Sequence, residues 1–404
     1  MNIKSLLLGS AAALIAVSGA RAADAVVVAE PEPAEYVKIC DVYGAGYFYI
    51  PGTETCLRIG GYVRYDIGAG DVESFDGARA IDRQDGSEND TWHKNARFTL
   101  KTWTGQETEL GTLKTYTETR FNFGNGSGVT TDAFGDSVVS ANDATNSGIS
   151  LNFAWIQLGG LRVGKDESAF DTFIGYAGNV IQDTLVPYGS FDTNVVQYYF
   201  DAGNGFSAVV SLEEGSGTQT HTAFSVNDEN GDGVVNGLDQ VTVTDANYTI
   251  DSYVPHVVVG LKYTQGWGAI TAVGAYDSNY EDLAGKIRLD VNATNELSLF
   301  VMGGYGEGDF GDGGLRNGHN FFKLWDGNWA VWGGGTYKFN EKTSFNAQLS
   351  YDEGKKFGLA ANVSYDIVPG FNVTAEVDYI NAGDSDFHDS FDGIGGILRF
   401  QRSF

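Results

Sequence analysis

The chain of 404 residues carries 53 acidic against 25 basic residues, and the formal charge of −28 argues against nucleic acid as a partner. After residue 22 the sequence holds no apolar run near the ~18–20 residues of a spanning helix, which excludes a purely helical membrane protein. The 55 Gly, 21 Tyr and 25 Phe beside only 6 Pro are typical of many strands joined by turns.

Residues 1–22 have the pattern of a secretory signal peptide. Lys4 supplies the basic start, apolar residues dominate 6–17, and Ala20-Arg21-Ala22 matches a cleavage site of small residues. We therefore expect export through the Sec pathway and a mature protein that begins at Ala23. Loss of the two basic residues takes the formal charge to about −30.

Residues 23–56 are predicted to form a periplasmic N-terminal leader. Its first part, 26–36, is acidic and contains proline, which favours an extended conformation. Cys40 and Cys56 are the two cysteines of the chain, and an oxidising compartment makes a disulfide that closes 40–56 the expected state. Two reduced structural thiols are the alternative. A zinc site is disfavoured because no histidine stands nearby to complete a ligand set.

From residue 57 onward, segments of about ten residues alternate apolar and polar side chains, as in outer-membrane barrels. In 57–67, for example, Ile59 and Val63 share one face of the strand, and Arg64 and Asp66 share the other. The sixteen predicted strands are 57–67, 95–103, 113–123, 149–159, 161–165, 194–200, 206–212, 255–264, 267–276, 283–292, 296–305, 328–339, 343–352, 356–368, 371–380 and 396–404.

The predicted fold class is therefore all-β, a transmembrane antiparallel barrel of sixteen strands over residues 57–404. A mean hydropathy of −0.19 is compatible with this fold, because only every second strand residue of such a barrel meets lipid. Short links such as 159–160, 265–266 and 369–370 predict periplasmic turns. Longer polar links predict external loops, and most acidic residues stand in them. These long links are 68–93, 124–148, 213–254, 306–327 and 381–393.

The chain ends inside a predicted strand. Leu398, Phe400, Arg402 and Phe404 share one face, which is apolar apart from Arg402. A last strand that closes a barrel must pair with the first, since an unsatisfied edge in hydrocarbon costs several kcal/mol per polar group. We therefore expect pairing up to Phe404, with the Arg402 head at the membrane interface or against a neighbouring subunit.

Several blocks resemble the alphaproteobacterial outer-membrane porin family, of the rhizobial general-porin type. The similarity is densest at MNIKSLLLGSAAAL, at residues 43–65, 107–123 and 254–263, and at the terminal GGILRFQRSF. The resemblance implies a trimeric barrel that passes small hydrophilic solutes and ions by passive diffusion. It also implies that Phe404 is read by the barrel assembly machinery, and that the protein meets outer-membrane lipid and lipopolysaccharide.

In porins of this kind the third external loop folds into the lumen. Here that loop corresponds to residues 166–190, within the long external connections but richer than the others in apolar side chains, such as Phe170, Phe173 and Tyr176. A water-exposed loop does not need them, whereas a loop packed on the inner wall does. A loop that covers a subunit contact is the alternative.

The inward loop predicts an acidic rim and an opposed set of bases. The acids are Asp166, Glu167, Asp171 and Asp183. The bases that face the lumen by strand parity are Arg58, Arg64, Arg97, Lys101, Arg120, Arg162, Lys286, Arg288 and Arg399. Opposed charges would set a transverse field, and charged rings are a means by which pores select ions. The excess of acidic residues predicts a weak cation preference, which bases near the narrowest point could reverse. The alternative for each charge is an ordinary solvated residue of the lumen.

The longest external loop contains DENGDGVVNGLD, residues 228–239. Its oxygen ligands have EF-hand spacing around Gly233, which predicts a calcium site: Asp228, Asn230, Asp232, the Val234 carbonyl, Asn236 and Asp239. Position 12 is Asp where Glu is usual, and flanking helices are not evident. The alternative is an acidic surface loop with turn residues. No other cofactor is expected.

An enzyme is the main rival class of function. The five histidines lie at or near external loops, and no G-x-S-x-G or H-E-x-x-H motif occurs, so no catalytic residue is predicted. A non-channel adhesin or structural barrel is disfavoured because sixteen strands leave an aqueous channel. A solute-specific channel would show an aromatic ladder or a dense basic cluster, and the sequence shows neither clearly. Thr115, Thr117 and Thr119 on an outward face predict a subunit contact.

Overall fold

The computed structural model describes residues 38–72, 77–125, 129–131, 137–139, 144–227, 240–307, 320–385, 387–388 and 390–404. Residues 40–404 form one compact unit. Residues 1–39 form another, of which only Lys38 and Ile39 are described.

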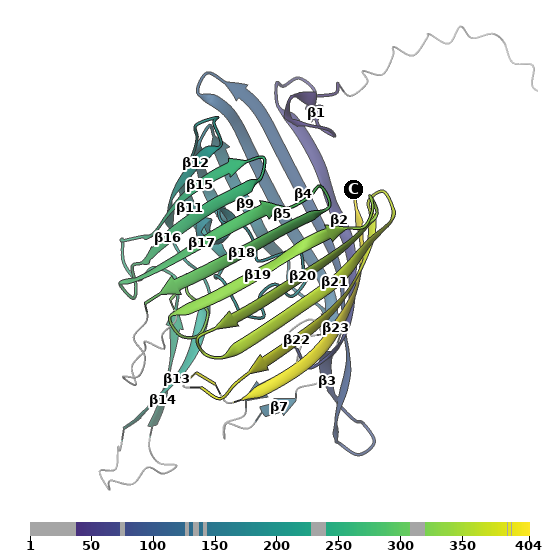
Figure 1. Cartoon of the computed structure of the whole chain (residues 1–404), viewed down its shortest axis with the longest axis vertical. Coiled ribbons are helices and arrows are strands. Elements are labelled where there is room, and N and C mark those ends of the chain that lie inside the picture. The colour runs from purple at the N-terminus through teal and green to yellow at the C-terminus, as the bar shows by residue number, and fades with distance from the viewer. Residues whose placement is uncertain are drawn as a thin grey trace, which may run out of the picture. The chain divides into compact units, whose positions relative to one another are not determined.

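The larger unit is a closed antiparallel barrel of sixteen strands, which confirms the predicted fold class (Figure 1). Each strand pairs with its neighbours along the chain, and β2 also pairs with β23, from Tyr62 opposite Ser403 to Gly70 opposite Gly395. The barrel strands are β2 (Cys56–Gly70), β4 (Glu88–Thr108), β5 (Gly111–Asn125), β9 (Ser150–Leu158), β10 (Leu161–Glu167), β11 (Asp192–Asp201), β12 (Phe206–Glu213), β15 (His256–Gln265), β16 (Gly268–Asp277), β17 (Asp282–Asn292), β18 (Leu297–Gly306), β19 (Trp329–Lys338), β20 (Thr343–Asp352), β21 (Lys356–Val368), β22 (Phe371–Ala382) and β23 (Phe391–Ser403).

Short elements lie outside this ring of strands. They are η1 (Asp41–Tyr43), α3 (Ala169–Thr172), β1 (Phe48–Tyr49), β3 (Gly77–Ile81), β6 (Val129–Thr131), β7 (Ser137–Val139), β8 (Ala144–Asn146), β13 (Thr218–Asn227) and β14 (Gln240–Asn247). Pairs β13–β14 and β6–β7 form separate small sheets, and β3 pairs with an extension of β4. Among the described residues, no helix has the length and apolar character of a membrane span.

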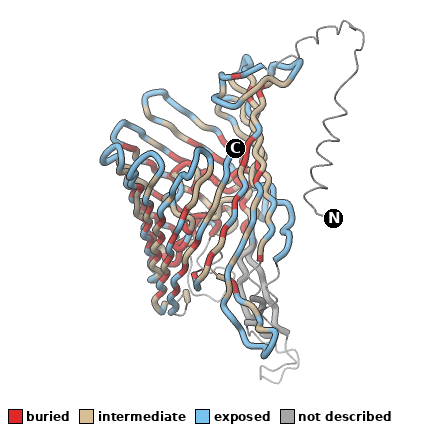
Figure 2. The backbone as a smooth tube through the Cα atoms, turned by 90° about the vertical axis from the view of Figure 1, so that its right-hand side faces the viewer, coloured by how far each residue is buried: buried red, intermediate tan, exposed pale blue. Residues whose placement is uncertain are grey.

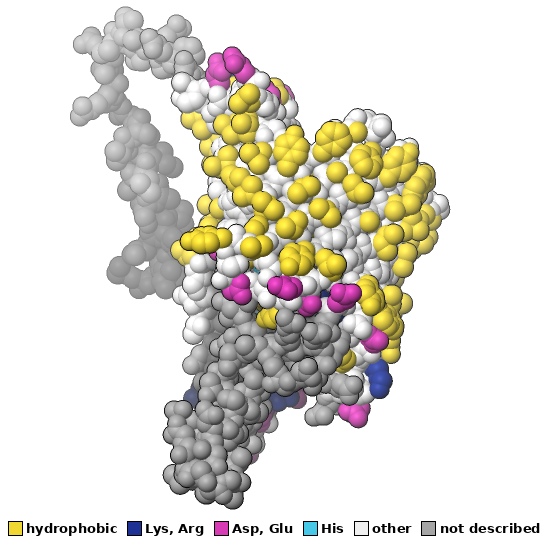
Figure 3. Space-filling model, turned by 90° about the vertical axis from the view of Figure 1, so that its left-hand side faces the viewer, with side chains coloured by type: hydrophobic (Ala, Val, Ile, Leu, Met, Phe, Trp, Pro, Cys, Tyr) yellow, Lys and Arg dark blue, Asp and Glu magenta, His cyan; other side chains and the backbone are white. Residues whose placement is uncertain are grey.

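Side chains alternate between the two faces of the barrel wall, as the sequence pattern requires. On β2, Ile59 and Val63 are about half exposed on the outer face, while Arg64 and Asp66 are buried inside. Buried and exposed positions follow one another along the strands in Figure 2. Hydrophobic side chains spread over the outer face in Figure 3, and acidic side chains stand along one border of this band. The outer face is therefore suited to lipid and the inner face to water.

The links between strands differ in length at the two ends of the barrel. One end has short turns at 109–110, 159–160, 202–205, 266–267, 293–296, 339–342 and 369–370. Gly159 and Gly370 adopt positive φ angles of 57° and 78°, which a side chain rarely permits. The other end carries the long connections, which lie at the lower end of Figure 1. This asymmetry is the one that outer-membrane barrels show between periplasmic turns and external loops.

The C-terminal residue continues the pairing of the closing strands. Phe404 and Gly61 exchange two backbone hydrogen bonds of 3.1 Å, and the Phe404 ring is exposed on the outer face. The Arg402 guanidinium donates to the Pro369 carbonyl at 3.0 Å, in a short turn. The guanidinium therefore lies at the short-turn end of the barrel, where it can reach the interface.

A disulfide closes the segment before the first barrel strand. Cys40 and Cys56 are bonded and buried, which confirms the predicted pairing. Between them β1 pairs with β2, and the Tyr43 ring lies over Gly105 of β4. The Tyr43 hydroxyl donates to Glu107 at 3.0 Å. These contacts hold the segment on the short-turn end of β2 and β4.

Candidate functional site

Residues 168–191, between β10 and β11, fold into the lumen and pack against the inner wall. The segment begins at Ser168, whose side chain caps α3 by accepting a hydrogen bond from the Phe170 amide at 3.1 Å. Apolar side chains of the segment are buried against inward-facing residues of β12 and β15–β19. This cluster contains Phe170, Phe173, Ile174, Ala177, Val186 and Tyr188 from the loop, and Val209, Val258, Val273, Phe300, Met302 and Trp332 from the wall. The apolar composition of the loop is thereby explained.

A second inward segment supports the loop. Phe321, Phe322 and Trp325, between β18 and β19, are fully buried in the same cluster. The rings of Phe170 and Phe322 lie 5.4 Å apart, which joins the two segments. From the sequence this stretch was predicted to be part of a polar external loop, because the Gly- and Asp-rich residues before it dominate the composition of 306–327.

The four predicted rim acids all have partners. Asp166 accepts from Arg162 at 2.6 Å, and Asp171 accepts from Lys286 at 2.6 Å. Asp183 accepts from the Tyr188 hydroxyl at 2.6 Å, and Glu167 accepts from the Tyr176 hydroxyl. Burial raises the pKa of Asp183 to about 6, and burial also raises the pKa of Asp171 against the pull of the Lys286 ammonium. These acids therefore stabilise the conformation of the loop and also give it negative charge.

Two of the predicted bases lie behind the loop. Lys286 is buried and also donates to the Tyr188 carbonyl at 2.7 Å. Arg288 donates to the carbonyls of Gly175 and Tyr176 at 3.2 and 2.5 Å, and pairs with Asp290. Both side chains belong to β17 and attach the loop to this strand by donating to backbone carbonyls of the loop.

Six other predicted bases lie together on the adjoining strands β23, β2, β4 and β5. We call this set the basic wall: Arg58, Arg64, Arg97, Lys101, Arg120 and Arg399. Asp66 accepts from Arg399 at 2.7 Å and lies 3.1 Å from Arg64, and Glu118 is shared by Lys101 and Arg120. In the described part of the chain, no carboxylate lies within ion-pair distance of Arg58 or Arg97. The wall therefore carries six cations and two carboxylates, and the two carboxylates pair with four of the cations.

A stack of aromatic rings extends from the basic wall along the inner surface. The Arg58 guanidinium lies 4.6 Å from the Trp103 ring, which stacks on Tyr116 at 5.4 Å. Tyr116 contacts Trp155 at 5.7 Å, and Arg162 lies 4.1 Å from Trp155. Because neighbouring rings and guanidinium groups cover one another's faces, the stack fixes the cations in place.

The sequence did not identify this aromatic stack or two buried carboxylates that hold the loop. Glu213 accepts from the Ala169 amide at 2.9 Å, at the loop base. Glu376 of β22 accepts from the amides of Ile181 and Gln182, at the loop tip. Strand parity places these residues in the lumen, but only the register between strands shows what they meet.

The described histidines do not form a catalytic site. His256 is fully buried, and its Nδ1 lies near both Ser278 Oγ at 3.3 Å and Asp277 Oδ1 at 3.4 Å. A serine-histidine-acid relay needs the serine and the acid on different ring nitrogens. Here Nε2 instead bonds to the Tyr248 carbonyl at 3.0 Å.

Within the described ranges, no group of three or more His, Cys, Asp or Glu side chains could hold a metal ion. The predicted calcium ligands of residues 228–239 lie outside the described residues.

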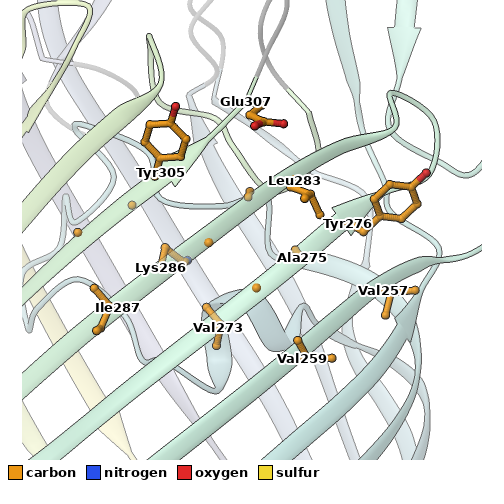
Figure 4. A pocket seen from close by; sticks show the side chains of 15 residues that line it. Val257, Val259, Val273, Ala275, Tyr276, Leu283, Lys286, Ile287, Tyr305 and Glu307 are labelled. Carbon is orange, nitrogen blue, oxygen red and sulfur yellow. The ribbon is translucent and has the colours of Figure 1, made fainter.

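Two features of the outer face lie outside the lumen. Thr102 and Thr117 share a hydrogen bond of 2.6 Å, as do Thr104 and Thr115. The outward threonines of β5 are therefore continued by those of β4, and we call this set the threonine face. A groove over β15–β18 is shown in Figure 4. Apart from Glu307 at one end, its outward-facing side chains are apolar or tyrosine, namely Val257, Val259, Tyr276, Leu283, Ile287 and Tyr305. The groove is therefore a lipid-facing feature of the wall and not part of the lumen.

Comparisons with known proteins agree with this architecture. Residues 24–396 match the family model of the Porin subfamily. The chain is 49% identical over 408 residues to "Porin Omp2b" of Brucella suis biovar 1 (strain 1330) and of Brucella abortus (strain 2308), with each chain covered completely. A solved mutant of the Rhodopseudomonas blastica porin superposes with a TM-score of 0.50 at 15% identity, over 86% of this chain and 100% of that one.

Proposed function

Because the chain belongs to the Porin subfamily, whose members are passive channels of the outer membrane and not enzymes, we propose that it is a general diffusion porin for small hydrophilic solutes and ions. The observation that carries the proposal is the inward fold of residues 168–191. The loop contacts strands from β12 round to β22, and among the described residues none of its hydrogen bonds goes to the bases of the wall formed by β23, β2, β4 and β5. Solutes would pass between the loop and this wall.

We propose a transverse field across that passage. The basic wall carries six cations and two carboxylates. The loop and the wall it packs on carry eight carboxylates and four cations: Asp166, Glu167, Asp171, Asp183, Glu213, Asp290, Glu376 and Asp378, with Arg162, Lys262, Lys286 and Arg288. Since the two sides balance in formal charge, the acidic excess elsewhere would set the ion preference. This supports a weak cation preference.

A solute-specific channel and a non-channel surface barrel are the alternatives. The aromatic stack resembles the ladder that a specific channel would use, but the rings of Trp103 and Trp155 are already in contact with Arg58, Tyr116 and Arg162. They are therefore poorly placed to stack against a passing solute, which favours general diffusion.

We further propose a homotrimer whose contact includes the threonine face of β4 and β5. Hydroxyl pairs such as Thr102–Thr117 meet lipid poorly, and a subunit would cover them better. The other partners in this proposal are outer-membrane lipid, lipopolysaccharide and the barrel assembly machinery, which would read Phe404. Residues 1–22 would be removed on export, 23–56 would form the periplasmic leader, and 57–404 the barrel.

Porins in general need no cofactor. Calcium in residues 228–239 remains a proposal that rests on the ligand spacing of the sequence. Isothermal titration of the whole barrel with calcium tests it. Binding at about 10⁻⁴–10⁻³ M that is lost on Asp232→Ala is expected. Absence of heat from the native protein would end the proposal.

Recording in a planar bilayer under a KCl gradient tests the channel itself. We expect conductance steps in groups of three and a small reversal potential on the cation side. A complete lack of conductance from folded, heat-modifiable protein would indicate a plugged barrel and would favour the surface-barrel alternative.

A further inference from the structure

A buried carboxylate of the barrel wall accepts hydrogen bonds from the backbone at the tip of the inward loop. Glu376 of β22 is 3% exposed, and its Oε1 accepts from the amides of Ile181 and Gln182, both at 2.8 Å. Its Oε2 accepts from the Ile181 amide at 2.6 Å and from Asn362 Nδ2 at 2.7 Å. A buried carboxylate is costly unless donors surround it, and here three N–H groups do so, with the Ile181 amide shared between the two oxygens.

The side chains beside Glu376 form a continuous row across four strands. Thr336, Asn346, Asn362 and Glu376 are direct register partners on β19, β20, β21 and β22. The Thr336 hydroxyl donates to Asn346 at 2.6 Å, Asn346 donates to Asn362 at 2.7 Å, and Asn362 donates to Glu376. Along the row, each residue therefore donates its hydrogen bond to the next residue in the direction of Glu376.

The loop closes this row into a ring. Asn179 Nδ2 donates to the Thr336 hydroxyl at 2.9 Å, and the Asn179 carbonyl accepts from Asn362 Nδ2 at 3.1 Å. The tip is thus held at both ends of the row, by Asn179 at Thr336 and by Ile181 and Gln182 at Glu376. The donors available at Glu376 are all N–H groups, so the ring needs an acceptor-only side chain at this position.

We propose that Glu376 is the positioning residue that latches the tip of the loop and so keeps the passage open at constant width. The proposal rests on the proposed channel function. Other anchors hold the ends of the loop: Glu213 accepts from Ala169 at the loop base, and Lys286 joins the two ends through Asp171 and the Tyr188 carbonyl. Release of Glu376 would let the tip move into the passage while the base and the barrel stay folded. The channel would then close and reopen spontaneously.

The test compares Glu376→Gln with a control of equal charge change, Asp366→Asn. Gln keeps the size of the side chain but turns one acceptor into a donor that opposes Asn362 or the tip amides. Asp366 lies on β21, on the same inner face as Asn362 but nearer the short-turn end, where it accepts from Asn372 at 2.8 Å; no hydrogen bond joins it to the described residues of the loop. Both variants remove one lumenal carboxylate, so a shift in ion preference is common to both.

In planar bilayers at fixed voltage, Glu376→Gln should close about tenfold more often than the native channel or more, and Asp366→Asn less than about twofold. Glu376→Asp keeps the charge but shortens the reach, and should give an intermediate closing rate with native ion preference. This variant also serves if the Gln variant fails to fold.

A second readout follows the tip directly. Both native cysteines are in the disulfide, so Val180→Cys supplies a single reactive thiol on the half-buried tip. Its rate of modification by a water-soluble maleimide should rise about tenfold or more when Glu376 is Gln. Closing and labelling rates equal to those of Asp366→Asn would overturn the latch. A native protein without conductance would instead overturn the channel function itself.

Discussion

The two sides of the lumen use charged side chains in different ways. Behind the loop, Lys286 is fully buried, and Glu376 nearly so, and their hydrogen bonds go to the loop. On the basic wall, Lys101 and Arg120 are about a quarter exposed and bond to Glu118 of the wall itself. The difference indicates that charges on the covered side mainly fix structure, while charges on the open side mainly act on passing ions.

The largest difference between the two sides is expected in the loss of stability when the same substitution, Lys→Ala, is made on each. Lys286→Ala leaves Asp171 buried without its cation, which should cost about 3–5 kcal/mol of folding free energy and loosen the loop. Lys101→Ala removes a partner of Glu118 that is about a quarter exposed, and should cost less than about 1 kcal/mol. Thermal unfolding of both purified variants measures the difference. If the two variants lose equal stability, the charges on the covered side are not more important for the fold than those on the open side.

Reversal of a charge on the open side should change the cation-to-anion permeability ratio and leave the stability of the fold unchanged. Arg97 donates to Asn122 at 2.7 Å and has no carboxylate within ion-pair distance among the described residues. Arg97→Glu should raise the cation-to-anion permeability ratio about twofold at 0.1 M salt, because the wall loses two units of positive charge. The reversal potential under a KCl gradient measures this change. Asn340→Asp in a short turn is the control, and a shift equal to that control would count against the basic wall.

Acid should weaken the cation preference through Asp183. Burial raises the pKa of this carboxyl to about 6, so it is charged at pH 7.5 and neutral at pH 5. Loss of this negative charge from the loop should lower the cation-to-anion ratio as the pH falls through about 6. Asp183→Asn should remove that component of the pH dependence. An unchanged pH profile in the variant would show that Asp183 does not face the passage.

The smallest effect is expected on the outer face. Thr117→Val removes one hydroxyl of the bonded pair with Thr102, which contributes about 1 kcal/mol at most. If the threonine face lies in a subunit contact, the temperature at which the oligomer dissociates on a gel should fall slightly. Thr343→Val at the short-turn end supplies the control. A dissociation temperature that falls equally in the control would remove the threonine face from the contact.

Strand number and face were predictable from sequence, because alternation of period two fixes which side chains point inward. The inward fold of the loop followed from its apolar residues together with the family resemblance. The aromatic stack and the Thr336–Glu376 row were not predictable, since each depends on the register between strands. Asp171 illustrates the limit: its charge and its place in the inward loop predicted a rim residue, but burial against Lys286 makes it an internal anchor.

The most direct measurement places a label on the loop where it borders the passage. Tyr176 is 45% exposed and lines two lumenal cavities between the loop and the barrel wall, one against β17–β19 and one against β19–β23. In Tyr176→Cys, modification by a bulky thiol reagent should reduce single-channel conductance by roughly half or more. The same reagent at Asn340→Cys, in a short turn, should leave conductance unchanged. If the label at Tyr176 has no effect while the thiol is fully modified, the loop does not form the narrow part of the channel.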